Sequence, residues 1–185
     1  MKKKAVRSAL LLLDVINPFD FEGAAKLAPR AIRAARHIAE LKARASERGI
    51  PCLYVNDNFG NWTSEFSALT RRCQRKEGAS TTLASLLAPG ARDLSVLKPR
   101  HSGFYGTPLE FLLEELKVSR LILTGIAVDM CVVATAQDAY MRKFDLWVPC
   151  DCVAAESLSR EKASLAHMAL TMKADIRPAK GGRLL

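Results

Sequence analysis

Short apolar runs alternate with helix-like segments along the whole chain of 185 residues. The first run, residues 8–14, stays apolar until its last residue, as in a strand that is buried on both faces. Alternation of this kind is typical of a mostly parallel sheet with helices on both faces. The sequence therefore predicts an α/β fold: a three-layer α/β/α, doubly wound sheet of about six strands with the order 3-2-1-4-5-6.

The expected elements are bounded by turn-forming or capping residues. Gly49 stops the first helix, and Thr107 followed by Pro108 is a typical N-cap and first helical position. The expected strands are residues 8–14, 50–56, 94–98, 120–124, 144–149 and 174–177. The expected helices are residues 24–48, 64–75, 107–117, 129–142 and 158–173.

Length and composition favour one globular domain, residues 1–185, with its core at about 8–177. Apolar residues make up 49% of the chain and charged residues 25%, which is typical of a soluble protein. The lysine-rich start does not predict a signal peptide, because Arg7 interrupts the apolar stretch, Asp14 ends it and no cleavage site follows. No run is long enough for a membrane span, so we expect a cytoplasmic protein without a membrane partner.

The formal net charge of +9 raises the alternative of a nucleic-acid partner. The basic residues are spread over the chain, however, and no nucleic-acid-binding motif accompanies them. Solvated faces and a preference for anionic ligands explain the charge more simply. We therefore expect a small-molecule substrate as the partner and no nucleic acid.

The five cysteines do not form a metal-binding or disulfide pattern. Their number is odd, and the pair at 150 and 152 lacks the CxxC spacing. Most are expected to be reduced, buried thiols. The exception is Cys131, which follows an apolar run (residues 121–124) and Gly125 at the start of an expected helix. Unpaired N–H groups and the helix dipole stabilise a thiolate at such a position.

Three reactive side chains come at or just after the carboxyl ends of expected strands: Asp14, Lys98 and Cys131. In an open α/β sheet this edge is where ligands bind. Asp14 can accept the thiol proton, and the charge of Lys98 favours both thiolate and carboxylate. Together they suit acyl transfer to cysteine followed by hydrolysis. Each also has a simpler explanation, as a loop-capping acid, an exposed lysine or a buried cysteine.

Three ordered blocks, residues 11–19, 97–107 and 124–132, resemble the isochorismatase-like cysteine hydrolases, and residues 134–139 and 151–155 also match. The resemblance covers about residues 8–172. It implies a catalytic triad of Asp14, Lys98 and Cys131. It also implies a cis peptide between Ile126 and Ala127, and an oxyanion hole formed by the amides of Ala127 and Cys131. Members of the family are often oligomeric, so a homo-oligomer is expected.

The chain departs from the family pattern at two places. Ile16 stands where members commonly have glutamine, and residues 54–62 lack the histidines with which some members bind a metal. Asp57 and Asn58 alone are a poor transition-metal site, so we expect no metal and no cofactor. Retention of Cys131 favours a small amide, carbamoyl or related substrate and a covalent, thioester-type intermediate. A vinyl-ether hydrolase, or a non-catalytic binding or assembly module with this fold, are the alternatives.

The expected substrate pocket is built from loops around the three reactive side chains: Phe19, Asn58, Trp62, Phe104, Tyr105 and Ile126. Phe19 and Trp62 are equally compatible with the core. Arg100 and His101 could bind a substrate carboxylate or face solvent. The predicted strand order makes one geometric demand: the strand that ends at Lys98 is not a neighbour of the strand before Cys131, so Lys98 must reach across.

Overall fold

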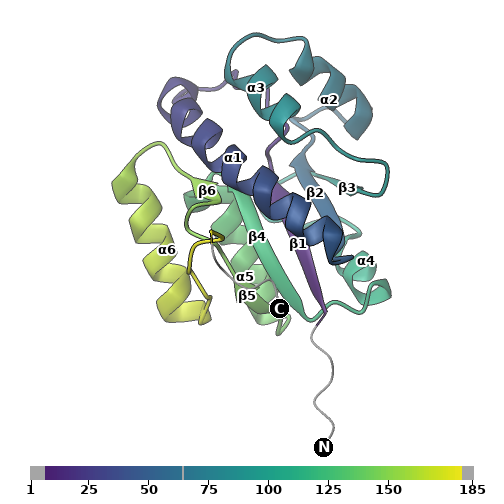
Figure 1. Ribbon diagram of the computed structural model, residues 1–185, viewed down its shortest axis with the longest axis vertical. Helices are drawn as coiled ribbons and strands as arrows, with labels where there is room; N and C mark the ends of the chain where they lie inside the picture. The colour runs from purple at the N-terminus through teal and green to yellow at the C-terminus, as the bar shows by residue number, and fades with distance from the viewer. Residues whose placement is uncertain (1–6, 64, 181–185) are drawn as a thin grey trace, which may run out of the picture.

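The computed structural model describes residues 7–63 and 65–180 (Figure 1). The predicted helix start at Ser64 and both ends of the predicted domain lie outside the described residues. The strands are β1 (Ser8–Leu13), β2 (Cys52–Asp57), β3 (Leu94–Lys98), β4 (Arg120–Ile126), β5 (Asp145–Trp147) and β6 (Val153–Ala154). The helices are α1 (Ala24–Glu47), α2 (Phe66–Gln74), α3 (Ala79–Leu86), α4 (Leu109–Glu115), α5 (Val133–Met141) and α6 (Leu158–Met172), with a π-helical turn η1 (Val128–Val132) before α5.

The strands pair in parallel in the order β3-β2-β1-β4-β5, which confirms the predicted order of the first five. The prediction of a last strand at residues 174–177 was wrong in extent. Only Asp175 pairs there, through a single parallel bridge to Trp147. The sixth strand is β6, which bonds to β4 beyond the end of β5. Two residues are too short to show an apolar run, so the sequence did not reveal it.

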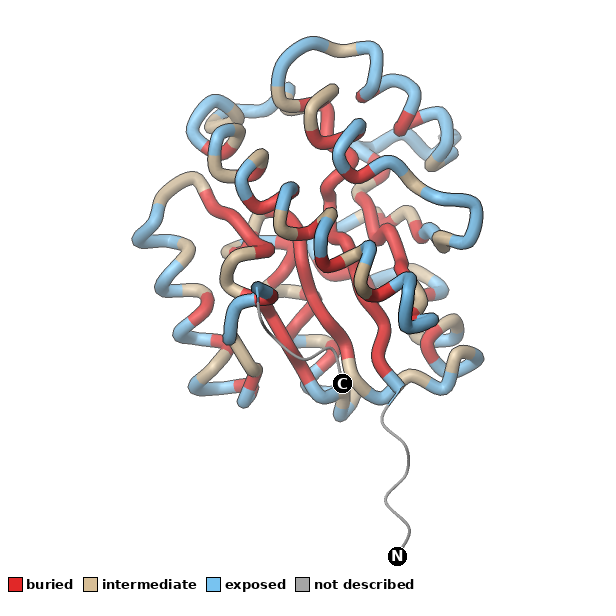
Figure 2. The backbone as a smooth tube through the Cα atoms, viewed as in Figure 1, coloured by how far each residue is buried: buried red, intermediate tan, exposed pale blue. Residues whose placement is uncertain are grey.

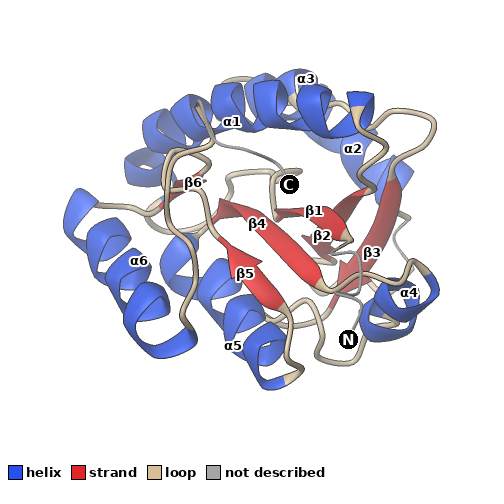
Figure 3. Ribbon diagram, turned by 60° about the horizontal axis from the view of Figure 1, so that its bottom comes forward, coloured by secondary structure: helices blue, strands red, loops and turns tan. Residues whose placement is uncertain are grey.

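Helices α1, α2 and α3 cover one face of the sheet, and α4, α5 and α6 cover the other (Figure 3). The leucines of β1 alternate between the two: Leu10 and Leu12 pack with α1, whereas Leu11 and Leu13 pack with the opposite helices. Strand β1 is buried along its whole length, and its neighbours β2 and β4 are buried except for one terminal residue each (Figure 2). This two-sided burial is why the run in β1 is continuously apolar rather than alternating.

Helix α3 was not predicted from the sequence. Its serines and threonines have modest helix propensity, and no side chain caps its start at Gly78. The helix is stabilised by packing, because Leu83 and Ala84 are buried in the cluster that contains α1. Tertiary contact therefore overrides a weak local preference.

The other helix boundaries differ from the predictions by small, explicable amounts. Helix α4 begins at Leu109, one residue after Pro108, the predicted first helical position. The Thr107 hydroxyl accepts a hydrogen bond from the Leu109 N–H at 3.2 Å. The helix expected from residue 129 begins instead as η1, in which the Ala127 carbonyl accepts from the N–H groups of Met130 and Val132. None of the helices in the described parts of the chain is long and apolar enough to cross a membrane.

Candidate active site

The structure brings Asp14, Lys98 and Cys131 together at the carboxyl edge of the sheet. Asp14 follows β1 with a φ of 51°, Lys98 is the last residue of β3, and Cys131 lies in η1. The Lys98 Nζ lies 2.9 Å from Asp14 Oδ2 and 3.5 Å from Cys131 Sγ. The long lysine side chain therefore meets the geometric demand of the strand order by reaching across the end of β2.

Lys98 is the charge at the centre of this cluster. Its side chain is 0% exposed, and its Nζ contacts Asp14, Asp57 Oδ2 at 3.5 Å and the Arg100 carbonyl at 3.1 Å. Burial lowers the pKa of Lys98, but the Asp14 carboxylate and the Cys131 sulfur raise it, and the balance lies above the ordinary value. Lys98 is therefore a cation at neutral pH.

Asp14 is a carboxyl group held in a protein interior. Burial raises the pKa of Asp14 above its ordinary value, although the Lys98 charge acts against this rise. The Asp57 N–H donates to Asp14 Oδ1 at 2.6 Å and fixes its orientation. A carboxyl group that takes up a proton more readily than an exposed aspartate is suited to general acid–base work.

Cys131 is also buried, and burial raises the pKa of its thiol. The Asp14 carboxylate raises this pKa further, and the Lys98 ammonium lowers it without restoring the ordinary value. The thiolate expected at a helix start is thus not the favoured resting form. A thiol in this state becomes a nucleophile only when a neighbouring acceptor takes its proton.

Two residues at the end of β2 support the site and were not singled out as such from the sequence. The buried Asn56 side chain accepts from the Ile16 N–H at 3.0 Å and donates to the Ile16 carbonyl at 2.9 Å, which holds the turn after Asp14. Asp57 contacts both Asp14 and Lys98. Their signal is the polar pair that ends the second apolar run, at the same sheet edge as Asp14.

A cavity of about 350 Å³ opens at Cys131. Its lining combines the reactive group with apolar and charged side chains: Asp14, Asn17, Asp20, Phe21, Glu22, Leu27, Asp57, Phe59, His101, Ile126, Ala127, Met130, Cys131, Glu156 and Arg160. A neighbouring hollow of about 520 Å³ shares Asp57, Phe59 and His101 with it. A small substrate can therefore reach the sulfur from solvent.

The predicted pocket residues fall into three groups. Ile126 lines the cavity at Cys131, and Asn58, Trp62 and Tyr105 line the neighbouring hollow with Arg100. Phe19 instead packs against the core and stacks on Phe21, and Phe104 is buried against Phe144.

His101 lines both hollows, with its Nδ1 3.6 Å from Cys131 Sγ. Phe21, Phe59, Met130 and Arg160 are lining residues that the sequence did not indicate.

The segment before Cys131 closely approaches β1. The peptide between Ile126 and Ala127 is cis. Gly125 has a φ of 113°, and a Cβ there would lie 2.1 Å from the Leu13 carbonyl oxygen, so only glycine fits. The amides of Ala127 and Cys131 remain the predicted oxyanion hole.

The side chains that the structure describes at this edge of the sheet do not form a metal-ligand set. Within residues 7–63 and 65–180, no three His, Cys, Asp or Glu side chains cluster as ligands. Asp57, the acid at the end of β2, is engaged by Lys98.

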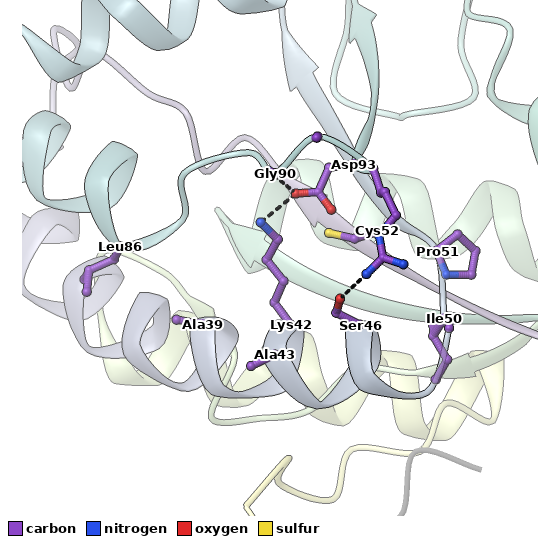
Figure 4. Close-up of a pocket in the computed structure, with 13 residues that line it drawn as sticks. Ala39, Lys42, Ala43, Ser46, Ile50, Pro51, Cys52, Leu86, Gly90 and Asp93 are labelled. Carbon is purple, nitrogen blue, oxygen red and sulfur yellow. Dashed lines mark hydrogen bonds and ion pairs between the residues drawn. The ribbon is translucent and has the colours of Figure 1, made fainter.

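A further hollow, of about 510 Å³, lies at the other end of β2 beside the last turns of α1 (Figure 4). Its charged groups have partners within the hollow: Lys42 pairs with Asp93 at 2.6 Å, and Arg92 donates to the Ser46 hydroxyl at 3.5 Å. Burial raises the pKa of the Cys52 thiol there to about 12. These bonds tie α1 to the start of β3, and the raised pKa of Cys52 disfavours the thiolate that a reactive cysteine needs.

A family model described as the isochorismatase domain matches residues 8–177. The chain belongs to the isochorismatase family. The isochorismatase family protein YaaI of Bacillus subtilis (strain 168) is 37% identical over 168 residues, which cover 91% of this chain and 92% of that protein. The fold is also that of N-carbamoylsarcosine amidase from Thermoplasma acidophilum, with a TM-score of 0.74 at 24% identity over 94% of this chain and 97% of the other.

The ureidoacrylate amidohydrolase RutB of Methylobacterium radiotolerans is 31% identical over 148 residues, or 68% of this chain. The match spans 54% of the length of that relative. The chain is thus an isochorismatase-family hydrolase, with Lys98 and Cys131 close together at the carboxyl edge of its sheet.

Proposed function

We propose that this hydrolase cleaves a C–N bond in a small amide, carbamoyl or related substrate, with Cys131 as nucleophile and without a metal. The observation that carries the proposal is the placement of the buried Lys98 ammonium between Asp14 and Cys131, below a cavity open to solvent. The likeness to a relative that is named as an amidohydrolase supports the choice of bond.

In the proposed reaction, Asp14 accepts the Cys131 proton while the sulfur attacks the substrate carbonyl carbon. The C–N bond then breaks, and the leaving nitrogen takes the proton from Asp14. Lys98 keeps the charge of the cluster balanced while the proton moves. The amides of Ala127 and Cys131 bind the developing oxyanion, an interaction that contributes roughly 3–4 kcal/mol in well-formed sites. Water hydrolyses the resulting thioester and releases the acid.

Small amides, ureido acids and carbamoyl compounds, screened for release of ammonia and acid, test the proposal. We expect Cys131→Ala to abolish turnover of any substrate found. Cys150→Ala is the matched control, because that partly exposed thiol lies outside the cavity lining, and it should retain wild-type rates. Full activity of Cys131→Ala would contradict the nucleophile assignment and favour chemistry that needs no thiol, such as vinyl-ether hydrolysis.

A further inference from the structure

His101 is an ionisable side chain beside the sulfur that the proposed mechanism does not use. Its Nδ1 lies 3.6 Å from Cys131 Sγ, within the range of a hydrogen bond to sulfur. The imidazole is exposed and lines both the cavity at Cys131 and the neighbouring hollow. It therefore stands where water enters the site.

The loop that carries His101 is held on both sides of this residue. Before it, Lys98 Nζ donates to the Arg100 carbonyl at 3.1 Å. After it, the Ser102 hydroxyl bonds to the Asp138 carboxylate, and the Gly103 N–H donates to Thr135 Oγ1 at 3.0 Å. Asp138 and Thr135 belong to α5, the helix that continues from Cys131. The backbone that carries His101 is thus held at a fixed position relative to the sulfur.

Close packing restricts the same loop further. A Cβ at Gly103 would lie 2.8 Å from Val55 Cγ1, so the backbone here sits directly against β2. A loop with this many anchors does not need to reorganise for its imidazole to act, and such preorganisation is what catalytic groups require.

Asp14 and His101 differ in their access to solvent. Asp14 is 4% exposed, and its carboxylate accepts a hydrogen bond from the Asp57 N–H and forms an ion pair with the Lys98 ammonium. His101 faces the open hollow. When Cys131 carries an acyl group, the attacking water comes from the cavity or from the neighbouring hollow, and His101 lines both. A base that reaches Sγ from this side also reaches a water that approaches the acyl carbon.

Building on the proposed function, we propose that His101 is a second catalytic residue, the general base that hydrolyses the acyl-enzyme. The imidazole Nδ1 takes a proton from water while the water oxygen bonds to the acyl carbon. The C–S bond then breaks, the acid leaves, and Sγ recovers a proton from Nδ1 at the distance that the structure shows. The thiol and the neutral imidazole are regenerated, so the step balances. Asp14 serves the formation of the thioester, and His101 serves its hydrolysis.

The experiment uses p-nitrophenyl acetate, which acetylates a reactive cysteine and releases coloured p-nitrophenol. We expect His101→Gln to give a burst at least as large as that of wild type, followed by a steady rate roughly 100-fold lower, the scale of general-base catalysis. Mass spectrometry should find acetylated Cys131 accumulating in this variant. His167→Gln is the matched control, because His167 is the exposed histidine of α6, and it should behave as wild type.

Each other result has a defined meaning. A steady rate in His101→Gln equal to wild type overturns the role of His101 and leaves the proposed function intact. Loss of the burst also overturns the role of His101 in hydrolysis of the acyl-enzyme, because His101 would then act in acylation. His101→Asn, which has a shorter amide side chain, repeats the measurement. Equal p-nitrophenol release by wild type and Cys131→Ala contradicts the nucleophile itself, so the failure of the two proposals is distinguishable.

Discussion

Replacement of Lys98 by methionine removes the buried charge and keeps most of the side-chain length. The Nζ lies 2.9 Å from Asp14 and 3.5 Å from Asp57, in a side chain that is 0% exposed. Removal of one partner from a buried ion pair typically costs about 3–5 kcal/mol, because the other charge remains without compensation. In a domain of this size the melting temperature should fall by about 6–20 °C.

The pH dependence of this loss follows from the carboxyl group that is left behind. Burial already raises the pKa of Asp14, and Lys98 opposes the rise. Without Lys98 the folded-state pKa of Asp14 moves further above its unfolded value, so the folded variant binds a proton more readily than the unfolded chain. The cost of Lys98→Met is therefore fully present at pH values above the raised pKa of Asp14 and shrinks as the pH falls through that pKa.

Urea unfolding of wild type and Lys98→Met at neutral and mildly acidic pH measures both effects. Lys42→Met is the matched control, because its ion pair with Asp93 is partly exposed (side chains 18% and 14%) and lies at the other end of β2. It should cost about 1 kcal/mol or less. Lys98→Met combined with Asp14→Asn should recover part of the stability. A loss below about 1 kcal/mol for Lys98→Met at neutral pH would refute the buried-charge reasoning.

Three further predictions concern the surroundings of the cluster. Gly125→Ala should destabilise the fold by about 2 kcal/mol or more, measured by urea unfolding, because its Cβ would meet a carbonyl oxygen of β1 at a positive φ. Asn56→Ala should cost about 1–3 kcal/mol and lower kcat/KM, measured by denaturation and on a confirmed substrate, because both Ile16 bonds are lost. In the absence of substrate, iodoacetamide should label Cys131 more slowly at neutral pH than free cysteine, because burial raises the pKa of the thiol. Peptide mass spectrometry measures the labelling rate. Faster labelling would contradict the conclusion that Cys131 is a protonated thiol when no substrate is bound.

Much of the site could be anticipated because parallel strands end at one edge. Asp14 and Lys98 end apolar runs, and Cys131 follows a third, so a sheet with this topology places them on the same side. Phe104 shows the limit of this reasoning: it follows the same strand as His101 within a few residues, yet one is buried and the other exposed. The spacing of hydrophobic residues along the chain does not predict whether a side chain in a loop points into the core or toward solvent.

The sequence by itself predicted the α/β class, the order of the first five strands and the placement of Asp14, Lys98 and Cys131 at one edge of the sheet, since apolar runs and turn residues mark the strands and their ends. Only the tertiary structure decided that Lys98 spans the end of β2, that Asp57 joins it and that His101 touches the sulfur. The same holds for α3 and β6, which depend on their neighbours. Charge placement and burial arise from long-range packing, and that packing raises the pKa of the Cys131 thiol where the helix start alone predicted a thiolate.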